Sequence, residues 1–142
     1  EAVMFGKILD ENQRKALVWD VERGAPNKII DQPWQSCSCI GGWHYNTSIY
    51  EKNEYKSAAY VAKLLVDIVS KNGNLLLSVP LRADGTFDEK EEKILNEFGA
   101  WMNINKEAIY DTRPWVVFGE GPIAEEDIGI CNVKGLFSLD PC

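Results

Sequence analysis

Apolar and polar positions along the chain follow patterns that predict four β-strands. In residues 17–22, LVWDVE, the two kinds of position alternate, so Asp20 and Glu22 share one face of the predicted strand. Residues 74–80, NLLLSVP, are almost wholly apolar, as expected for a strand that is buried on both faces. The two remaining predicted strands span residues 2–5 and 35–40.

The same pattern predicts two helices, each next to the last of these strands. Residues 57–71 carry apolar side chains at helical spacing, and Ser57 is a suitable N-cap. A second helix begins after Asp88, which is expected to form a capping pair with Glu91. Its predicted buried stripe consists of Ile94, Leu95, Phe98, Trp101 and Met102. Residues 24–33 and 41–56 are predicted to be loops.

Alternating strands and helices, with one doubly buried strand, favour a parallel α/β architecture. The chain has 142 residues, and a complete eight-stranded α/β barrel needs about 200 or more. Four strands and two good helices therefore fit about half of a (β/α)8-type barrel, and an open sheet fits the pattern equally well. We expect residues 1–118 to form this unit and residues 119–142 to form a tail with weak strand character.

Composition limits the kinds of partner, metal and cofactor that the chain is expected to bind. The net charge is −7, and no basic patch interleaved with aromatic residues occurs, so nucleic acid is not expected to bind. No apolar run reaches membrane-spanning length, so no membrane partner is expected either. Cys37 and Cys39 are interpreted as buried thiols. With a single histidine, no C-x2-C pair and no glycine-rich phosphate motif, we expect neither a metal nor a cofactor.

Candidate chemistry gathers where the predicted strands end. Lys7 follows the first strand, Glu22 closes the second, Trp43 and His44 follow the third, and Arg82 follows the fourth. In parallel α/β folds the carboxyl ends of the strands carry the functional groups. A strand-end glutamate is more often a solvated charge, and an aromatic loop is often a packed lid. Because all of these residues fall on one rim, a sugar-binding site is the favoured interpretation.

Asp20 and Glu22 also spell D-x-E, a pattern that chitinase-like glycosidases use for substrate-assisted hydrolysis. That pattern needs further glycine and aspartate residues upstream in the same strand. Here residues 15–18 are KALV, so this alternative ranks low.

Longer blocks of the sequence carry a more specific signal. The chain resembles the α-L-fucosidases of glycoside hydrolase family 29 from about residue 2 to residue 115, in the blocks LVWDVERG, PWQSCSCIGGWHYN, VDIVSKNGNLLLSVPLRADGTFDEKE and NKEAIYDTRPW. The catalytic domain of that family is a (β/α)8-like barrel, and these blocks resemble its strands five to eight. The resemblance thus implies a partial barrel, in agreement with the count of elements.

The resemblance also implies a substrate and roles for individual residues. It implies retaining hydrolysis of α-L-fucosyl linkages in fucosylated oligosaccharides or glycoconjugates. One carboxyl group acts as the nucleophile and a second as the general acid/base in such a mechanism. Glu22 matches the general acid/base position, and Trp43 matches an aromatic residue of the fucose pocket. Lys7 falls about where many members have an arginine, and His44 and Trp34 are expected at or behind the sugar subsites.

Two hypotheses about activity follow from what the chain lacks. The family's nucleophilic aspartate ends strand four, upstream of the resemblance, so Asp10 and Asp20 are the candidates to replace it. The first hypothesis is a fucosidase that forms a homo-oligomer, because a second copy would cover the two sheet edges that a half-barrel exposes. The second is a catalytically incomplete half-barrel that at most binds fucosylated glycans. The chain enters a strand-like run at once without an initiator methionine, so we expect it to be cut from something longer.

Overall fold

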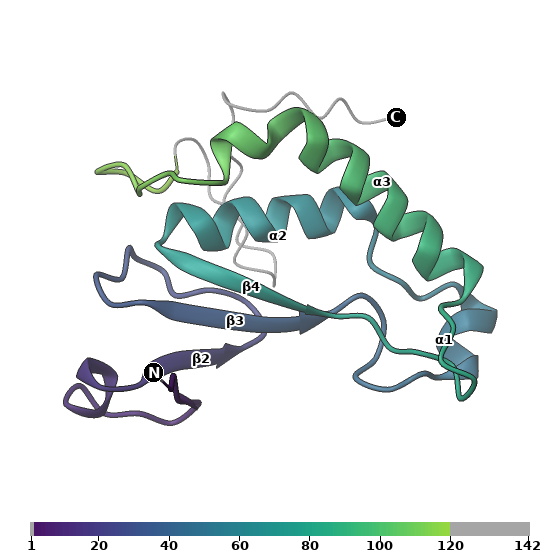
Figure 1. The fold of residues 1–142 in the computed structure, drawn as a ribbon, viewed down its shortest axis with the longest axis horizontal. Coiled ribbons are helices and arrows are strands. Elements are labelled where there is room, and N and C mark those ends of the chain that lie inside the picture. The colour runs from purple at the N-terminus through teal and green to yellow at the C-terminus, as the bar shows by residue number, and fades with distance from the viewer. Residues whose placement is uncertain (1, 120–142) are drawn as a thin grey trace.

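A computed structural model describes residues 2–119, and these form one parallel sheet with helices packed beside it (Figure 1). The sheet order β1-β2-β3-β4 follows the chain, and all neighbouring strands are parallel. This confirms the predicted parallel α/β architecture. The strands are β1 (Phe5–Gly6), β2 (Val18–Glu22), β3 (Trp34–Cys39) and β4 (Gly73–Ser78).

Within residues 2–119, three α-helices accompany the sheet. They are α1 (Thr47–Lys52), α2 (Ala58–Ser70) and α3 (Glu89–Asn105), with short 3-10 turns at η1 (Gln13–Lys15) and η2 (Lys106–Ala108). Helix α2 packs against β4, and α3 packs against α2. In Figure 1 both helices run above the strands, and the arrowheads of β3 and β4 point toward α1. The carboxyl ends of these strands and α1 therefore lie on the same side of the molecule.

The first strand is shorter than the sequence predicts. Residues 2–5 were expected to be a strand, but β1 covers only Phe5 and Gly6, which pair with Val18 and Trp19 of β2. Just before β1, Met4 is 65% exposed, so no neighbouring element buries this segment. A strand on the edge of a sheet extends only as far as its partner and its packing support it.

Both predicted helix starts are confirmed by their capping contacts. The Ser57 side chain accepts a hydrogen bond from the Tyr60 amide at the start of α2. The Asp88 carboxylate accepts hydrogen bonds from the Lys90 and Glu91 amides at the start of α3. These side chains satisfy amides that have no partner within the helix.

A hydrophobic core lies between the sheet and α2. Trp34 is completely buried there and packs with Ile30, Leu64 and Ile68. Its indole nitrogen donates a hydrogen bond to the Lys71 carbonyl at 2.9 Å. A core of this kind holds β3 and β4 rigid, so that it fixes the loops that follow them.

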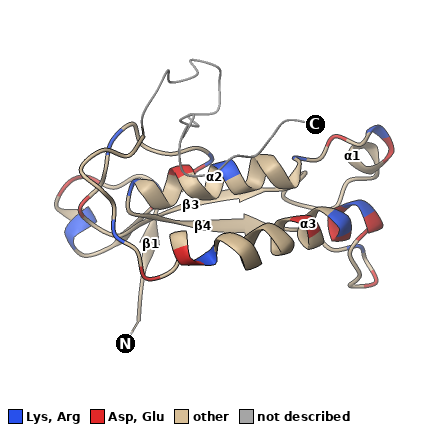
Figure 2. Cartoon of the chain, turned by 90° about the horizontal axis from the view of Figure 1, so that it is seen from above, with Lys and Arg blue, Asp and Glu red and all other residues tan. Residues whose placement is uncertain are grey.

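Charged side chains are distributed unevenly over these elements. Neither β3 nor β4 contains a charged residue, and the charges lie mainly on loops and on helices (Figure 2). Strand β2 is the exception, because Asp20 and Glu22 lie within it. These two carboxylates therefore stand out at the carboxyl ends of the strands.

Candidate functional site

The carboxyl end of β2 carries a cluster of polar groups centred on Lys7. This strand-end cluster consists of Lys7, Asp20, Glu22 and Cys37. The Lys7 ammonium lies 3.1 Å from Asp20 Oδ2 and 3.5 Å from Glu22 Oε2, and it donates a hydrogen bond to Cys37 Sγ at 3.2 Å. Strand pairing brings these groups together, because Lys7 directly follows β1, which pairs with β2, while Cys37 is the β3 partner of Glu22 in the sheet register.

The two carboxylates of the cluster differ in exposure. The Asp20 side chain is 14% exposed and also accepts a hydrogen bond from Gln35 Nε2 at 3.1 Å. The Glu22 side chain is 54% exposed. Glu22 is therefore the carboxylate that a ligand can reach, and Asp20 lies behind it.

Electrostatics hold the enclosed ion pair in its charged form. Burial acts to raise the pKa of Asp20, but hydrogen bonds from Gln35 and Lys7 outweigh it and lower the pKa below its usual value. Hydrogen bonds to Cys37 and Asp20 raise the pKa of the Lys7 ammonium above its ordinary range. The site thus keeps a fixed positive charge beside Glu22.

Trp43 and His44 lie on the loop that follows β3, and both are exposed. The guanidinium of Arg23, the residue after Glu22, lies 5.3 Å from the centre of the Trp43 ring. Arg23 adopts a left-handed conformation with φ of 60°, and its amide donates to the Cys37 carbonyl. The structure therefore brings Trp43 next to the segment that carries Glu22.

Trp34 does not reach this edge. It is the first residue of β3, whereas the site lies where β3 ends, and a strand of six residues spans about 17 Å. Its place is the core described above. In the sequence, this tryptophan differs from Trp43 only in that Trp43 follows two glycines.

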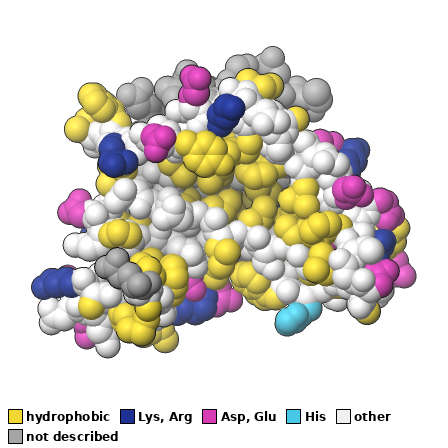
Figure 3. Space-filling model, viewed as in Figure 1, with side chains coloured by type: hydrophobic (Ala, Val, Ile, Leu, Met, Phe, Trp, Pro, Cys, Tyr) yellow, Lys and Arg dark blue, Asp and Glu magenta, His cyan; other side chains and the backbone are white. Residues whose placement is uncertain are grey.

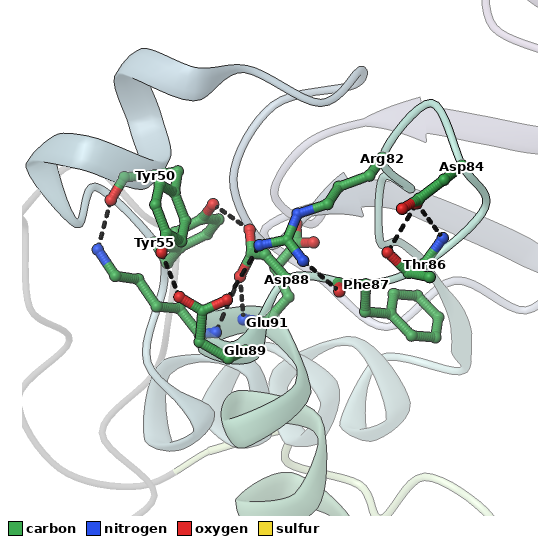
Figure 4. Close-up of polar contacts among 10 residues, drawn as sticks. Tyr50, Tyr55, Arg82, Asp84, Thr86, Phe87, Asp88, Glu89 and Glu91 are labelled. Carbon is green, nitrogen blue, oxygen red and sulfur yellow. Dashed lines mark hydrogen bonds and ion pairs between the residues drawn. The ribbon is translucent and has the colours of Figure 1, made fainter.

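A second polar cluster, which the sequence pattern did not predict, joins α1 to the start of α3 (Figure 4). Arg82 Nη2 lies 3.0 Å from Glu89 Oε2, and its guanidinium carbon lies 5.8 Å from the centre of the Tyr50 ring. The Tyr50 hydroxyl in turn donates a hydrogen bond to Glu89. The sequence places Arg82 after the fourth predicted strand. Its contact with α1 could not be predicted, because α1 has no apolar stripe from which a helix would be expected.

Within this cluster Glu91 is a buried carboxylic acid. Its side chain is completely covered, and neither oxygen has a hydrogen-bond partner among the residues that the structure describes. Burial, together with repulsion from the Asp88 carboxylate, raises the pKa of Glu91 to about 7, with the positive charge of Arg82 opposing part of the shift. Asp88 itself accepts a hydrogen bond from the Tyr55 hydroxyl at 2.6 Å.

Two hollows in the described residues are formed without the charged groups around Lys7. One of about 610 Å³ opens on the helix side of the sheet, and its lining includes Trp19, Arg23 and Tyr60. The other, of about 570 Å³, lies along β4 and α3, and its lining includes Leu75 and Phe98. Neither is lined by Lys7, Glu22 or Trp43.

Metal ligands and membrane segments were also sought in the described part of the chain. Between residues 2 and 119, no group of three or more His, Cys, Asp or Glu side chains is placed to hold a metal ion. Over the same residues, no helix has the length and apolar character to cross a membrane.

Comparisons with known proteins point to one enzyme family. The family profile described as Alpha-L-fucosidase matches residues 3–107. The chain is 32% identical over 96 residues to the plasma alpha-L-fucosidase of Homo sapiens, covering 66% of this chain and 20% of the relative. It is 37% identical over 93 residues to the alpha-L-fucosidase of Dictyostelium discoideum, covering 65% and 20%.

The fold comparison agrees with the sequence comparison. The solved structure of alpha-L-fucosidase isoenzyme 1 from Paenibacillus thiaminolyticus matches with a TM-score of 0.66 and 30% identity, covering 72% of this chain and 25% of that chain. The chain thus spans about a fifth of the length of the curated relatives that it matches.

Proposed function

This chain belongs to the α-L-fucosidase family, and on that premise we propose that it takes part in hydrolysing terminal α-L-fucosyl linkages of oligosaccharides or glycoconjugates. The observation that carries the proposal is the strand-end cluster, in which an exposed carboxylate, a fixed ammonium and an exposed indole lie on neighbouring segments. Carboxylates and ammonium groups bind sugar hydroxyls, and an indole face stacks on the apolar face of a sugar ring.

Glu22 is the proposed general acid/base. A retaining glycosidase uses one carboxylate to attack the anomeric carbon, while the second protonates the leaving oxygen and then activates water. Glu22 is suited to the second task because more than half of its side chain is exposed at the strand end. Trp43 and His44 supply the sugar platform and a hydroxyl contact, and Lys7 orients Glu22.

Neither aspartate suggested by the sequence is well placed as the nucleophile. Both oxygens of Asp20 are engaged, one by Lys7 and one by Gln35. Asp10 is exposed, and its carboxylate accepts hydrogen bonds from the Asn12 and Gln13 amides. The proposal therefore assigns the attacking group to neither of them.

The sheet itself is proposed to be part of a (β/α)8-like barrel. Support comes from four parallel strands in sequential order, with α2 on one face and Asp20 and Glu22 on the other. In such barrels the active site lies at the carboxyl ends of the strands, which is where the cluster lies.

A second copy of the chain is the proposed partner for the open parts of this sheet. Among the described residues, β1 and β4 each pair on one side only. Leu76 of β4 is 54% exposed, and apolar side chains gather in the middle of one face, below α3 (Figure 3). Burying such surface is favourable by about 25 cal/mol for each Å². Light scattering over a dilution series should show a dimer or larger species, and a compact monomer at every concentration would refute the association.

Hydrolysis of aryl α-L-fucosides tests the proposed function. Replacing the acid should matter most when the leaving group is poor, so Glu22→Gln should slow a phenyl fucoside far more than an activated dinitrophenyl fucoside. Glu11→Gln, which changes an exposed glutamate before η1, is the matched control and should behave as wild type. Unchanged rates in Glu22→Gln would remove Glu22 from the mechanism. Fucose binding without turnover would favour the alternative, a module that binds fucosylated glycans through the Trp43 platform.

A further inference from the structure

Asp20 has no role in the mechanism above, yet both of its carboxylate oxygens are engaged, one by Lys7 and the other by Gln35. We propose that Asp20 is a positioning residue, which anchors the Lys7 ammonium so that this cation holds the carboxylate of Glu22 in place. This inference rests on the proposed function, because it gives Asp20 a task in the same site.

The distances identify Asp20 as the main anchor of Lys7. An ammonium group has three donors, and three acceptors surround this one: Asp20 Oδ2 at 3.1 Å, Cys37 Sγ at 3.2 Å and Glu22 Oε2 at 3.5 Å. The two close contacts come from the residues behind the exposed edge. Glu22 is the most distant of the three, so it is the group being held rather than the group that holds.

Asp20 is itself fixed in a way that Glu22 is not. Asp20 pairs with Gln35 in the register of β2 and β3, and Gln35 Nε2 donates to Asp20 Oδ1 at 3.1 Å. The Asp20 side chain is only 14% exposed. One carboxylate oxygen is thus held by β3, and the other is left to bind Lys7.

The weakness of exposed ion pairs explains why Lys7 needs Asp20 as an anchor. An isolated ion pair between two exposed side chains contributes little, because water screens the charges and ordering both side chains costs entropy. The side chains of Lys7 and Glu22 are 49% and 54% exposed, so their pair alone is too weak to restrain a lysine with four rotatable bonds. The contact with Asp20, whose side chain is only 14% exposed, supplies the restraint. Glu22 Oε2 then meets a cation that is already in place.

Removal of a positioning residue and removal of a nucleophile have different effects on turnover. Without Asp20, the Lys7 ammonium loses its closest partner and becomes more available to solvent. Glu22 keeps its own chemistry but loses a fixed neighbour on one oxygen. Turnover should therefore fall in part, whereas loss of a nucleophile would abolish it.

The reactivity of the Lys7 amine tests the inference without any need for turnover. Trace labelling with acetic anhydride, read by mass spectrometry of peptides, reports the availability of each lysine. Asp20→Asn keeps the shape of the side chain and should raise the labelling rate of Lys7 at least threefold, while exposed Lys28 stays unchanged. Asp31→Asn is the matched control, since Asp31 is an exposed aspartate in the loop before β3. An unchanged Lys7 rate in Asp20→Asn would overturn the inference.

A second variant covers the case in which Asp20→Asn does not fold. Gln35→Met removes the donor that holds Asp20 Oδ1 but keeps the charge, so the Lys7 labelling rate should rise by a smaller factor. No rise in this variant would then refute the anchoring network.

Kinetics on an aryl α-L-fucoside complete the test. Asp20→Asn should lower kcat about tenfold and leave KM within a factor of two, because orientation of Glu22 is lost while the sugar contacts remain. Increased Lys7 labelling with unchanged kcat would refute a role in the reaction. If the wild-type chain shows no turnover, the proposed function fails, and the labelling result still decides whether Asp20 anchors Lys7.

Discussion

Single residues of the same type have very different places in this molecule. Trp34 and Trp43 both lie near the third strand in the sequence, and both were expected to be near a sugar. Trp34 begins β3 and is completely buried, whereas Trp43 lies beyond its end and is 36% exposed. The distance along a strand, rather than residue type, separates a core residue from a site residue.

This difference predicts opposite effects of two alanine substitutions. Trp43→Ala should weaken fucose binding by about 1–3 kcal/mol, the scale of a buried aromatic contact, and should leave the thermal midpoint nearly unchanged. Trp34→Ala should lower the free energy of unfolding by about 3–5 kcal/mol, since it leaves a cavity in the core. Calorimetry of both variants, with fucose titration of Trp43→Ala, checks this. A large loss of stability in Trp43→Ala with unchanged affinity would contradict the assignment.

Gly73 is a residue whose small size the core requires. It pairs with Trp34 across β3 and β4, and a Cβ atom there would lie 2.4 Å from two atoms of the indole ring. Gly73→Ala should therefore lower the free energy of unfolding by about 1–3 kcal/mol, as overpacked cores do. Gly99→Ala is the control, because Gly99 lies in α3 with no atom near the added methyl group. That change should stabilise the helix by up to about 1 kcal/mol. Equal effects in chemical denaturation would show that the contact with Trp34 does not matter.

At the scale of elements, sequence patterns predicted the helices whose formation depends mainly on their own residues. Apolar stripes and capping side chains identified α2 and α3 because these signals lie within the helices themselves. Helix α1 was missed since only six residues form it, and it depends on the Asn46 cap and on contacts with the start of α3. The late start of β1, at Phe5, likewise depends on its neighbours rather than on its own sequence.

The start of α3 predicts a pH-dependent stability. Because the pKa of Glu91 is raised to about 7 in the folded state and is about 4.3 in an unfolded chain, the folded state binds more protons between these values. The contribution of Glu91 to the free energy of unfolding should therefore fall as pH rises from about 4 to 7, and level off above 7. Glu91 faces Asp88 and Arg82, and Asp88 opposes its ionisation while Arg82 favours it.

Two variants isolate this effect. Glu91→Gln should remove most of the loss of thermal stability between pH 5 and pH 8, since an amide cannot ionise. Glu92→Gln alters the neighbouring exposed glutamate and should retain the full loss. Identical pH profiles for wild type and Glu91→Gln would show that the buried carboxyl group does not govern stability.

At the scale of the whole molecule, the sequence predicted the parallel α/β sheet but could not place side chains on its edge. The alternation in LVWDVE put Asp20 and Glu22 on one face, and in the structure both contact Lys7. The contact of Lys7 with Cys37 required the register of β2 against β3, which no local pattern specifies. The expected tail, residues 119–142, lies almost wholly outside the described residues.

The most direct measurement is an NMR titration of the isotopically labelled chain with L-fucose. The account predicts saturable shifts of backbone amides around Lys7, Glu22 and Trp43, together with the Trp43 indole signal, and no comparable shifts with D-fucose. Saturable shifts confined to the hollow along β4 and α3, or no saturable shifts at any accessible concentration of L-fucose, would contradict the claim that the carboxyl ends of these strands form a fucose site.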